Sequence, residues 1–177
     1  MRALILSALL GLTACGATVP TAETPRTVER VDLPRYLGLW HEVARLPQRF
    51  QDSANLRCEN VTAEYAVIAP GRISVRNTCV NALAAERRQS EVRGEAYVVE
   101  GSEGARLRVS FFWPFHGDYW VIGLDPEYRW AVVGAPSRRS LWVLSRTAVL
   151  PPEQLEQALA IARREGFDLA PLVLARP

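Results

Sequence analysis

Lysine is missing from this chain of 177 residues, and histidine is scarce. All 21 cationic side chains are arginine, and with 19 acidic residues they leave a net charge of +2, which is too small to indicate binding to nucleic acid. The two histidines do not suggest a metal site, because His41 is expected to face outward from a strand and His116 to lie in a loop. We therefore expect no metal, no cofactor and no nucleic-acid partner.

Catalytic motifs are missing as well. The sequence contains neither a G-x-S-x-G nucleophile motif nor a glycine-rich phosphate-binding loop. Cys58 as a nucleophile would need a base beside it, and we expect its neighbour to be Cys79 instead. These absences favour a binding protein and not an enzyme.

Long apolar runs are missing except at the N-terminus. Residues 3–12 are apolar and uncharged, follow the basic Arg2, and are far fewer than the roughly 18 needed for a membrane-spanning helix. The next four residues, Leu-Thr-Ala-Cys ending at Cys15, resemble the lipobox of bacterial lipoproteins. This resemblance implies that residues 1–14 are a signal peptide that is removed and that Cys15 is lipidated. The alternative is an ordinary secretory signal with a chance cysteine.

Residues 15–32 contain Pro, Thr and Ala without apolar periodicity, which predicts a flexible tether between the lipid anchor and the folded domain. By the same resemblance, Gly16 stands where lipoproteins of the inner membrane often carry aspartate. The expected location is therefore the outer membrane, with the domain held by its lipid anchor.

The rest of the chain, residues 33–177, reads as short strands separated by turn residues. Arg106, Arg108 and Ser110 alternate with apolar residues, as in a sheet with one solvated face. A helix is predicted over 153–165, with an apolar stripe and Gly166 as its C-terminal cap. We predict an all-β fold, an eight-stranded antiparallel up-and-down barrel with the helix packed on its outside. The predicted strands are 36–45, 58–67, 72–81, 87–99, 105–112, 118–124, 129–134 and 140–146.

Three short motifs resemble the signatures of one family. Gly38 and Trp40 form a G-x-W motif, Asp125 and Tyr128 resemble the second signature, and Arg146 matches the arginine that ends the last strand. In this order, the motifs resemble those of the lipocalins, and the domain is similar to bacterial outer-membrane lipocalins and apolipoprotein D. The second motif departs from the common Thr-Asp-Tyr, since Leu124 precedes Asp125 and Tyr128 comes later.

Meander geometry brings these motifs together. The start of the first strand, the link after the sixth strand and the end of the eighth all lie at the same end of such a barrel. Arg146 is therefore expected over the ring of Trp40, where a cation–π contact is worth about 0.5–2 kcal/mol. We interpret the five signature residues as a structural plug of the closed end and not as ligand contacts.

The opposite end should form the mouth of a ligand cavity. The link 46–57 is the longest and is expected to cover the mouth as a lid, while Trp113 and Phe115 lie in a link at the rim. These two aromatic residues fit either a lipid entrance or ordinary loop packing. A slip of one residue would invert the inward face of any strand. The side chains expected inside, as ligand contacts, are Ala44, Leu107, Val109, Phe111, Tyr119, Val121, Trp142 and Leu144.

Polar groups at the mouth are interpreted in two ways. Arg138 and Arg139 could hold a phosphate or carboxylate headgroup, and the alternative is a solvated charged rim.

Cys58 opens one strand and Cys79 closes the next, so the two should lie nearly opposite in a hairpin. We predict a disulfide between them, with free thiols as the alternative.

The lipocalin resemblance implies a carrier that binds, stores or transports fatty acids or lysophospholipids for maintenance of the cell envelope. Some members of that family are dimers, so a homodimer is a further expectation. Three alternatives stay open. They are a carrier of another apolar ligand such as a haem-like or isoprenoid compound, a tethered scaffold with a filled barrel, and a lipocalin-type enzyme.

Overall fold

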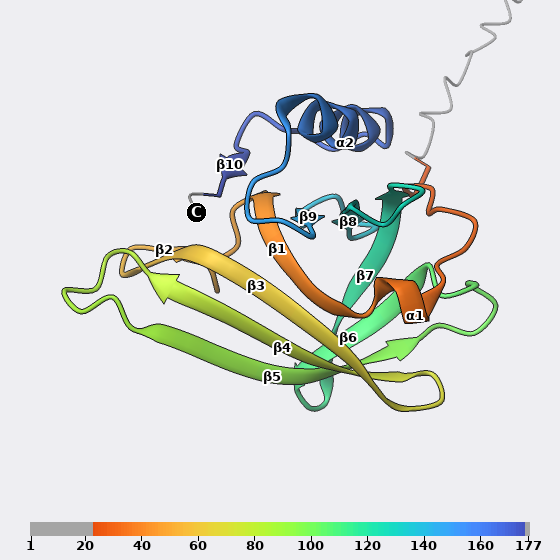
Figure 1. Ribbon diagram of the computed structural model, residues 1–177, viewed down its shortest axis with the longest axis horizontal. Coiled ribbons are helices and arrows are strands. Elements are labelled where there is room, and N and C mark those ends of the chain that lie inside the picture. The colour runs from red at the N-terminus through yellow and green to blue at the C-terminus, as the bar shows by residue number, and fades with distance from the viewer. Residues whose placement is uncertain (1–22, 176–177) are drawn as a thin grey trace, which may run out of the picture.

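Figure 1 presents a computed structural model that describes residues 23–175; the predicted signal peptide and Cys15 lie outside the described residues. The described chain forms an antiparallel sheet in which successive strands are neighbours. Two strands, β2 (Asp52–Ser53) and β10 (Val173–Leu174), have only two residues each. The main strands are β1 (Gly38–Arg45), β3 (Leu56–Ala69), β4 (Arg72–Asn81), β5 (Gln89–Val98), β6 (Arg106–Phe112), β7 (Phe115–Leu124), β8 (Trp130–Gly134) and β9 (Leu141–Ser145).

Strand β1 closes this sheet into a cylinder. It pairs with β3 over Gly38–His41 and with β9 over His41–Arg45. Beyond His41, β3 no longer pairs with β1, and the C-terminal strand β10 pairs with Ala44 and Arg45 in its place. The closed, antiparallel, up-and-down barrel of eight main strands confirms the predicted fold.

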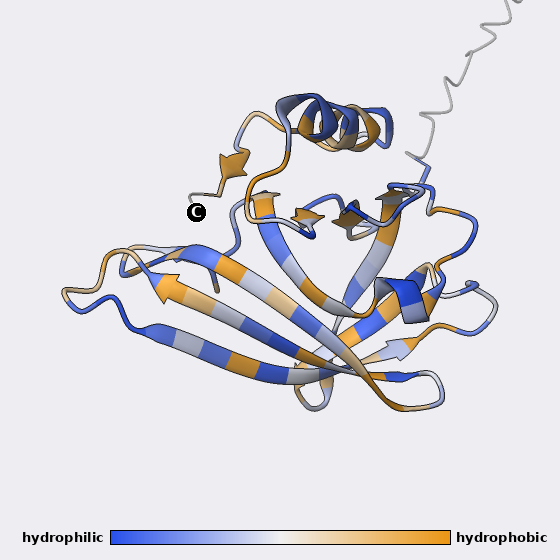
Figure 2. Ribbon diagram, viewed as in Figure 1, coloured by the Kyte–Doolittle hydropathy of each residue, from blue (hydrophilic) through white to orange (hydrophobic). Residues whose placement is uncertain are grey.

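Alternation along the strands separates the inside of the barrel from its surface. Figure 2 shows apolar and polar residues following one another along β3, β4 and β5. On β6, Leu107 is buried inside, whereas Arg106 and Arg108 are exposed. The period of two thus gives each strand an apolar inner face, as the sequence pattern predicted.

A second apolar cluster lies outside the barrel, under helix α2 (Pro152–Arg164). Ala158, Leu159 and Ala162 of the helix pack against β8 and β9, whose outward residues include Val132 and Val143. The outer packing of α2 was predicted from its apolar stripe. Neither helix of the described chain is long and apolar enough to cross a membrane.

The structure corrects the predicted position of Ala44. A β-bulge lies between Glu42 and Ala44, and it shifts the alternation of β1 by one residue. Ala44 therefore belongs to the outer cluster and not to the barrel interior. Arg45 is fully buried instead.

The N-terminal segment also differs from the prediction. Residues 23–32 are fastened along the barrel, since the backbone N–H of Val28 donates to the carbonyl of Val121 and that of Val31 to Glu103. The flexible tether predicted over 15–32 is thus wrong for this part. A short helix, α1 (Leu33–Tyr36), follows it, so β1 begins at Gly38 and not at residue 36.

Candidate functional site

One end of the barrel is closed by a stack of Arg146 on Trp40. The guanidinium carbon lies 3.7 Å from the centre of the indole ring. Its nitrogens donate to the backbone carbonyls of Leu39 at 2.8 Å and Arg35 at 2.7 Å. The indole N–H of Trp40 donates to the carbonyl of Tyr36 at 2.7 Å, so α1 and β1 are joined at this point. Gly38, at the start of β1, has a φ of +87°, a backbone conformation that favours glycine.

The link between β7 and β8 brings the second signature to the same end. The Asp125 carboxylate accepts hydrogen bonds from the backbone N–H groups of Glu127 and Arg129 and from the Arg129 guanidinium. These donors, the guanidinium first, lower the pKa of Asp125. The carbonyl of Tyr128 accepts from Nε of Arg146 at 3.3 Å, and its ring lies under Arg35. The three motifs therefore meet in space although they are far apart in sequence.

Above this plug the barrel interior is apolar. The expected inward residues Leu107, Val121 and Leu144 are buried there. Four others, namely Val109, Phe111, Tyr119 and Trp142, are partly buried and pack on the same cluster.

Along β5, the exposure of the inward side chains rises toward the other end. On β5, Ala96 is 3% exposed, whereas Val92, four residues nearer the mouth on the same face, is 38% exposed. The inner face of β5 is thus covered near the end that Trp40 and Arg146 occupy and exposed to solvent toward the opposite end.

The lower interior is tightly packed. It contains a small cavity, in which the centre of a water molecule can occupy about 10 Å³. The cavity is lined by Tyr36, Tyr65, Ile73, Ala96, Leu107, Val109 and Tyr119. That volume is about the minimum for a single water. Three phenol oxygens meet beside it, with Tyr119 2.7 Å from Tyr36 and 3.1 Å from Tyr65. Burial raises the pKa of Tyr65 to about 12, so these phenols are neutral at pH 7.

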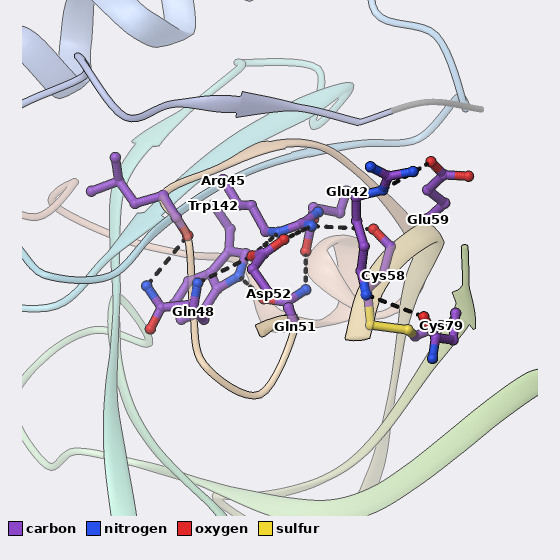
Figure 3. Close-up of polar contacts among 12 residues, drawn as sticks. Glu42, Arg45, Gln48, Gln51, Asp52, Cys58, Glu59, Cys79 and Trp142 are labelled. Carbon is purple, nitrogen blue, oxygen red and sulfur yellow. Dashed lines mark hydrogen bonds and ion pairs between the residues drawn. A yellow bond between two sulfur atoms is a disulfide. The ribbon is translucent and has the colours of Figure 1, made fainter. Parts of the chain in front are cut away.

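A buried ionic cluster lies on the mouth side of β1 (Figure 3). Arg45 donates to Glu42 at 2.6 Å, to Asp52 at 2.8 Å and 2.5 Å, and to the carbonyl of Cys58 at 3.1 Å. Burial raises the pKa of Glu42, although Arg45 and Gln51 oppose the shift. Hydrogen bonds from Arg45 lower the pKa of Asp52. This cluster was not predicted, because its only signal in the sequence is the pair of opposite charges, Glu42 and Arg45, in one strand.

The cluster fastens the link between β1 and β3 to the barrel. Gln51 donates to Glu42 at 2.7 Å and accepts from the indole N–H of Trp142 at 3.0 Å. Asp52 is held by Arg45, while the ring of Phe50 lies 6.4 Å from that of Trp142 and is mostly exposed. The predicted lid segment is therefore attached through buried polar groups.

The predicted disulfide is confirmed. Cys58 at the start of β3 and Cys79 near the end of β4 are bonded, with their Cα atoms 5.3 Å apart (Figure 3). The carbonyl of Cys58 also accepts from Arg45, so the covalent bridge and the ionic cluster share a residue.

The rim carries exposed aromatic residues. Trp113 is 80% and Phe115 is 77% exposed at the tip of the β6–β7 hairpin. Within the described chain, their rings are neither packed into the interior nor part of the inner apolar cluster. His116 lies 5.5 Å from Trp113, ring centre to ring centre, and no group of His, Cys, Asp and Glu among the described residues suits a metal ion.

The structure contradicts the predicted headgroup role of Arg138. Its Nε donates to the carbonyl of Glu165 at 2.7 Å, at the C-terminal end of α2, and another nitrogen donates to the carbonyl of Glu23. Carbonyl groups at a helix C-terminus attract a cation, so this guanidinium binds the helix and not the barrel mouth. Arg139 is exposed, and its headgroup role stays a prediction.

An eight-stranded barrel with a plugged end and an apolar, accessible end has the architecture of a small-ligand carrier. The chain belongs to the lipocalin family, since the model of a lipocalin-like domain matches residues 31–177. This family membership confirms the predicted resemblance, and with it the expectation of a ligand carrier and not an enzyme.

Relatives of known name support the assignment. The chain is 41% identical over 160 residues to outer membrane lipoprotein Blc of Escherichia coli K12, covering 90% of this chain and 86% of that one. It is 30% identical over 180 residues to apolipoprotein D of Macaca fascicularis, covering 96% and 91%.

Solved structures agree in fold. Insecticyanin from the tobacco hornworm has a TM-score of 0.68 at 17% identity, covering 88% of this chain and 86% of that one. Lobster apocrustacyanin A1 has a TM-score of 0.63 at 16% identity, covering 89% and 92%.

Proposed function

We propose that this lipocalin is a membrane-tethered carrier that binds single-chain lipids, fatty acids or lysophospholipids, for maintenance of the cell envelope. The observation that carries the proposal is the inward face of the barrel, which is apolar and, along β5, becomes more exposed toward the mouth. An acyl chain there gains about 25 cal/mol for each Å² of apolar surface removed from water. Since the interior near the plug has room for about one water molecule, the acyl chain of the ligand binds in the half of the barrel nearer the mouth.

The relatives support the location. Several are named outer membrane lipoprotein Blc, and the lipobox-like segment of this chain supplies Cys15 as the lipidated residue. We propose that the protein is anchored in the outer membrane through Cys15. Metabolic labelling with radioactive palmitate tests the anchor, because labelling of the wild type and its loss in Cys15→Ser are expected. Equal labelling of both proteins would contradict the proposal.

Ligand binding is tested with a pair of adjacent substitutions. Val92 faces the interior near the mouth, whereas Arg93 is exposed on the outer face of the same strand. Val92→Trp fills the upper interior and should weaken binding of oleate and lysophosphatidylcholine at least tenfold in a fluorescence displacement assay. Arg93→Trp adds the same side chain outside and should leave binding unchanged. Equal effects of the two substitutions would argue against binding inside the barrel.

Native mass spectrometry of the purified protein distinguishes the alternatives. A retained lipid supports the proposal, and a coloured cofactor indicates another apolar ligand. The absence of any ligand, together with no binding of added lipids, indicates a scaffold with a filled barrel. The same spectra report whether the protein is a homodimer.

A further inference from the structure

Asn77 is a polar residue in the apolar inner wall of the barrel. It lies on β4 directly opposite Ala63 of β3 and Val92 of β5, and Ala63 belongs to the inner apolar cluster. Directly paired residues of antiparallel strands share a face, so Asn77 faces inward as well. Its next inward neighbour along β4 is Val75, which is buried. The amide thus stands among apolar side chains.

The side-chain oxygen of Asn77 is buried and has no hydrogen-bond partner among the described residues. A buried amide oxygen without a partner lowers the stability of a fold, and an apolar residue of similar size would avoid that cost. Barrel packing alone therefore does not account for an asparagine at this position.

A second asparagine on the same strand shows the contrast. The side-chain oxygen of Asn81 accepts from the backbone N–H groups of Arg57 and Leu83, at 3.2 Å and 3.0 Å, and its NH₂ donates to the carbonyl of Asn55 at 2.9 Å. Asn81 is used by the fold, since it joins β4 to the neighbouring link. Asn77 carries the same amide group, but its side-chain oxygen makes no such hydrogen bond among the described residues.

Asn77 lies at a depth that a ligand can reach. It is four residues along β4 from Ile73, which lines the water-sized cavity, a distance of about 13 Å at 3.3 Å per residue. Val92, its partner on β5, is 38% exposed and lies in the part of β5 that precedes the pairing with β6. The amide therefore stands between the mouth and the packed lower interior.

We infer that Asn77 is a hydrogen-bonding subsite for the uncharged polar group, a carboxamide or an alcohol, of an acyl-chain ligand; the inference rests on the proposed lipid-binding function. An amide side chain offers both donors and an acceptor, which a carboxamide or hydroxyl matches. A carboxylate only accepts, and burying its charge among Ala63, Val75 and Val92 is costly. The buried guanidinium of Arg45 is not available as a partner for such a carboxylate, because it is already paired with Glu42 and Asp52.

The test compares Asn77→Leu with Asn81→Leu in the full-length purified protein, using oleamide, oleyl alcohol and oleate as probes. Asn77→Leu is expected to weaken binding of oleamide and oleyl alcohol about tenfold and to change binding of oleate less than twofold. It is also expected to raise the urea midpoint of the ligand-free protein, because the unpartnered amide is removed. Asn81→Leu is expected to lower that midpoint and to leave the preference among the three probes unchanged.

The outcomes separate the subsite from the proposed function. The subsite is overturned if Asn77→Leu weakens all three probes equally, or if it lowers the midpoint of the ligand-free protein as Asn81→Leu does. Binding of none of the probes to the wild type would overturn the proposed function and the subsite with it. Normal binding of oleate with an unaltered preference in Asn77→Leu would overturn the subsite alone.

Discussion

Replacing Arg146 tests whether the plug at the closed end holds the barrel together. The guanidinium covers the face of Trp40 at 3.7 Å and donates to backbone carbonyls of α1 and β1. The cation–π contact is worth about 0.5–2 kcal/mol, and each hydrogen bond from a charged group about 1.5–3 kcal/mol. Because the group is only partly buried, water replaces some of these bonds, and we predict that Arg146→Met lowers the free energy of unfolding by about 3 kcal/mol.

The assay is urea unfolding followed by tryptophan fluorescence, together with a thermal scan. For a domain of this size, about 3 kcal/mol corresponds to a decrease in Tm of about 6–12 °C. Arg146→Lys keeps the charge but lacks the planar fork, so it should recover no more than about half of the loss. Arg108→Met, on the exposed face of β6, is the control and should change stability by less than about 0.5 kcal/mol.

Full stability of Arg146→Lys would refute the role of the planar guanidinium. A loss in Arg146→Met no larger than in Arg108→Met would refute the plug altogether.

Three other predictions concern the walls of the barrel. Replacing Cys58 and Cys79 together by serine should cost about 3 kcal/mol, given their separation of 21 residues, and unfolding curves equal to those of the wild type would contradict this. Asp52→Asn should cost about 2–3 kcal/mol at pH 7, since it leaves the buried Arg45 with one carboxylate fewer. Because the folded pKa of Asp52 is lowered, its stabilisation is complete above the unfolded pKa of about 3.9 and is lost as the pH falls through the folded value. Urea titrations between pH 7 and pH 2 should show the wild-type advantage shrinking, and a constant difference would exclude this role. Gly94→Ala should cost about 1–3 kcal/mol, since a Cβ would lie 2.4 Å from a carbonyl oxygen of β6, and a thermal scan without a decrease in Tm would disprove that clash.

Most of the barrel could be predicted because its determinants are local. The alternation on β6 and the turn residues that separate the strands are visible in short windows of sequence. Pairing then follows from strand order, which also places Trp40, Asp125 and Arg146 at one end. The disulfide followed from the same geometry, since Cys58 and Cys79 occupy facing ends of one hairpin.

The failures have physical causes that alternation does not reveal. The bulge beside Ala44 depends on how β1 turns from one partner strand to another, which is a property of the closed sheet. Arg138 lies in a link at the rim, but its guanidinium donates to a carbonyl at the end of α2. Glu42 and Arg45 lie in one strand, but the sequence of that strand does not show that the two charges are buried together.

The dual pairing of β1 has a consequence for the order of folding. Its pairing with β3 joins neighbouring parts of the chain, whereas Arg45 meets Trp142 about a hundred residues later. Contacts of such long range form slowly, because a large loop must close before they stabilise anything. The hairpins from β3 to β8 can therefore assemble first, and the cylinder is sealed only after β9 has been synthesised. A chain that stops before Leu141 keeps two open sheet edges, which are sites for aggregation.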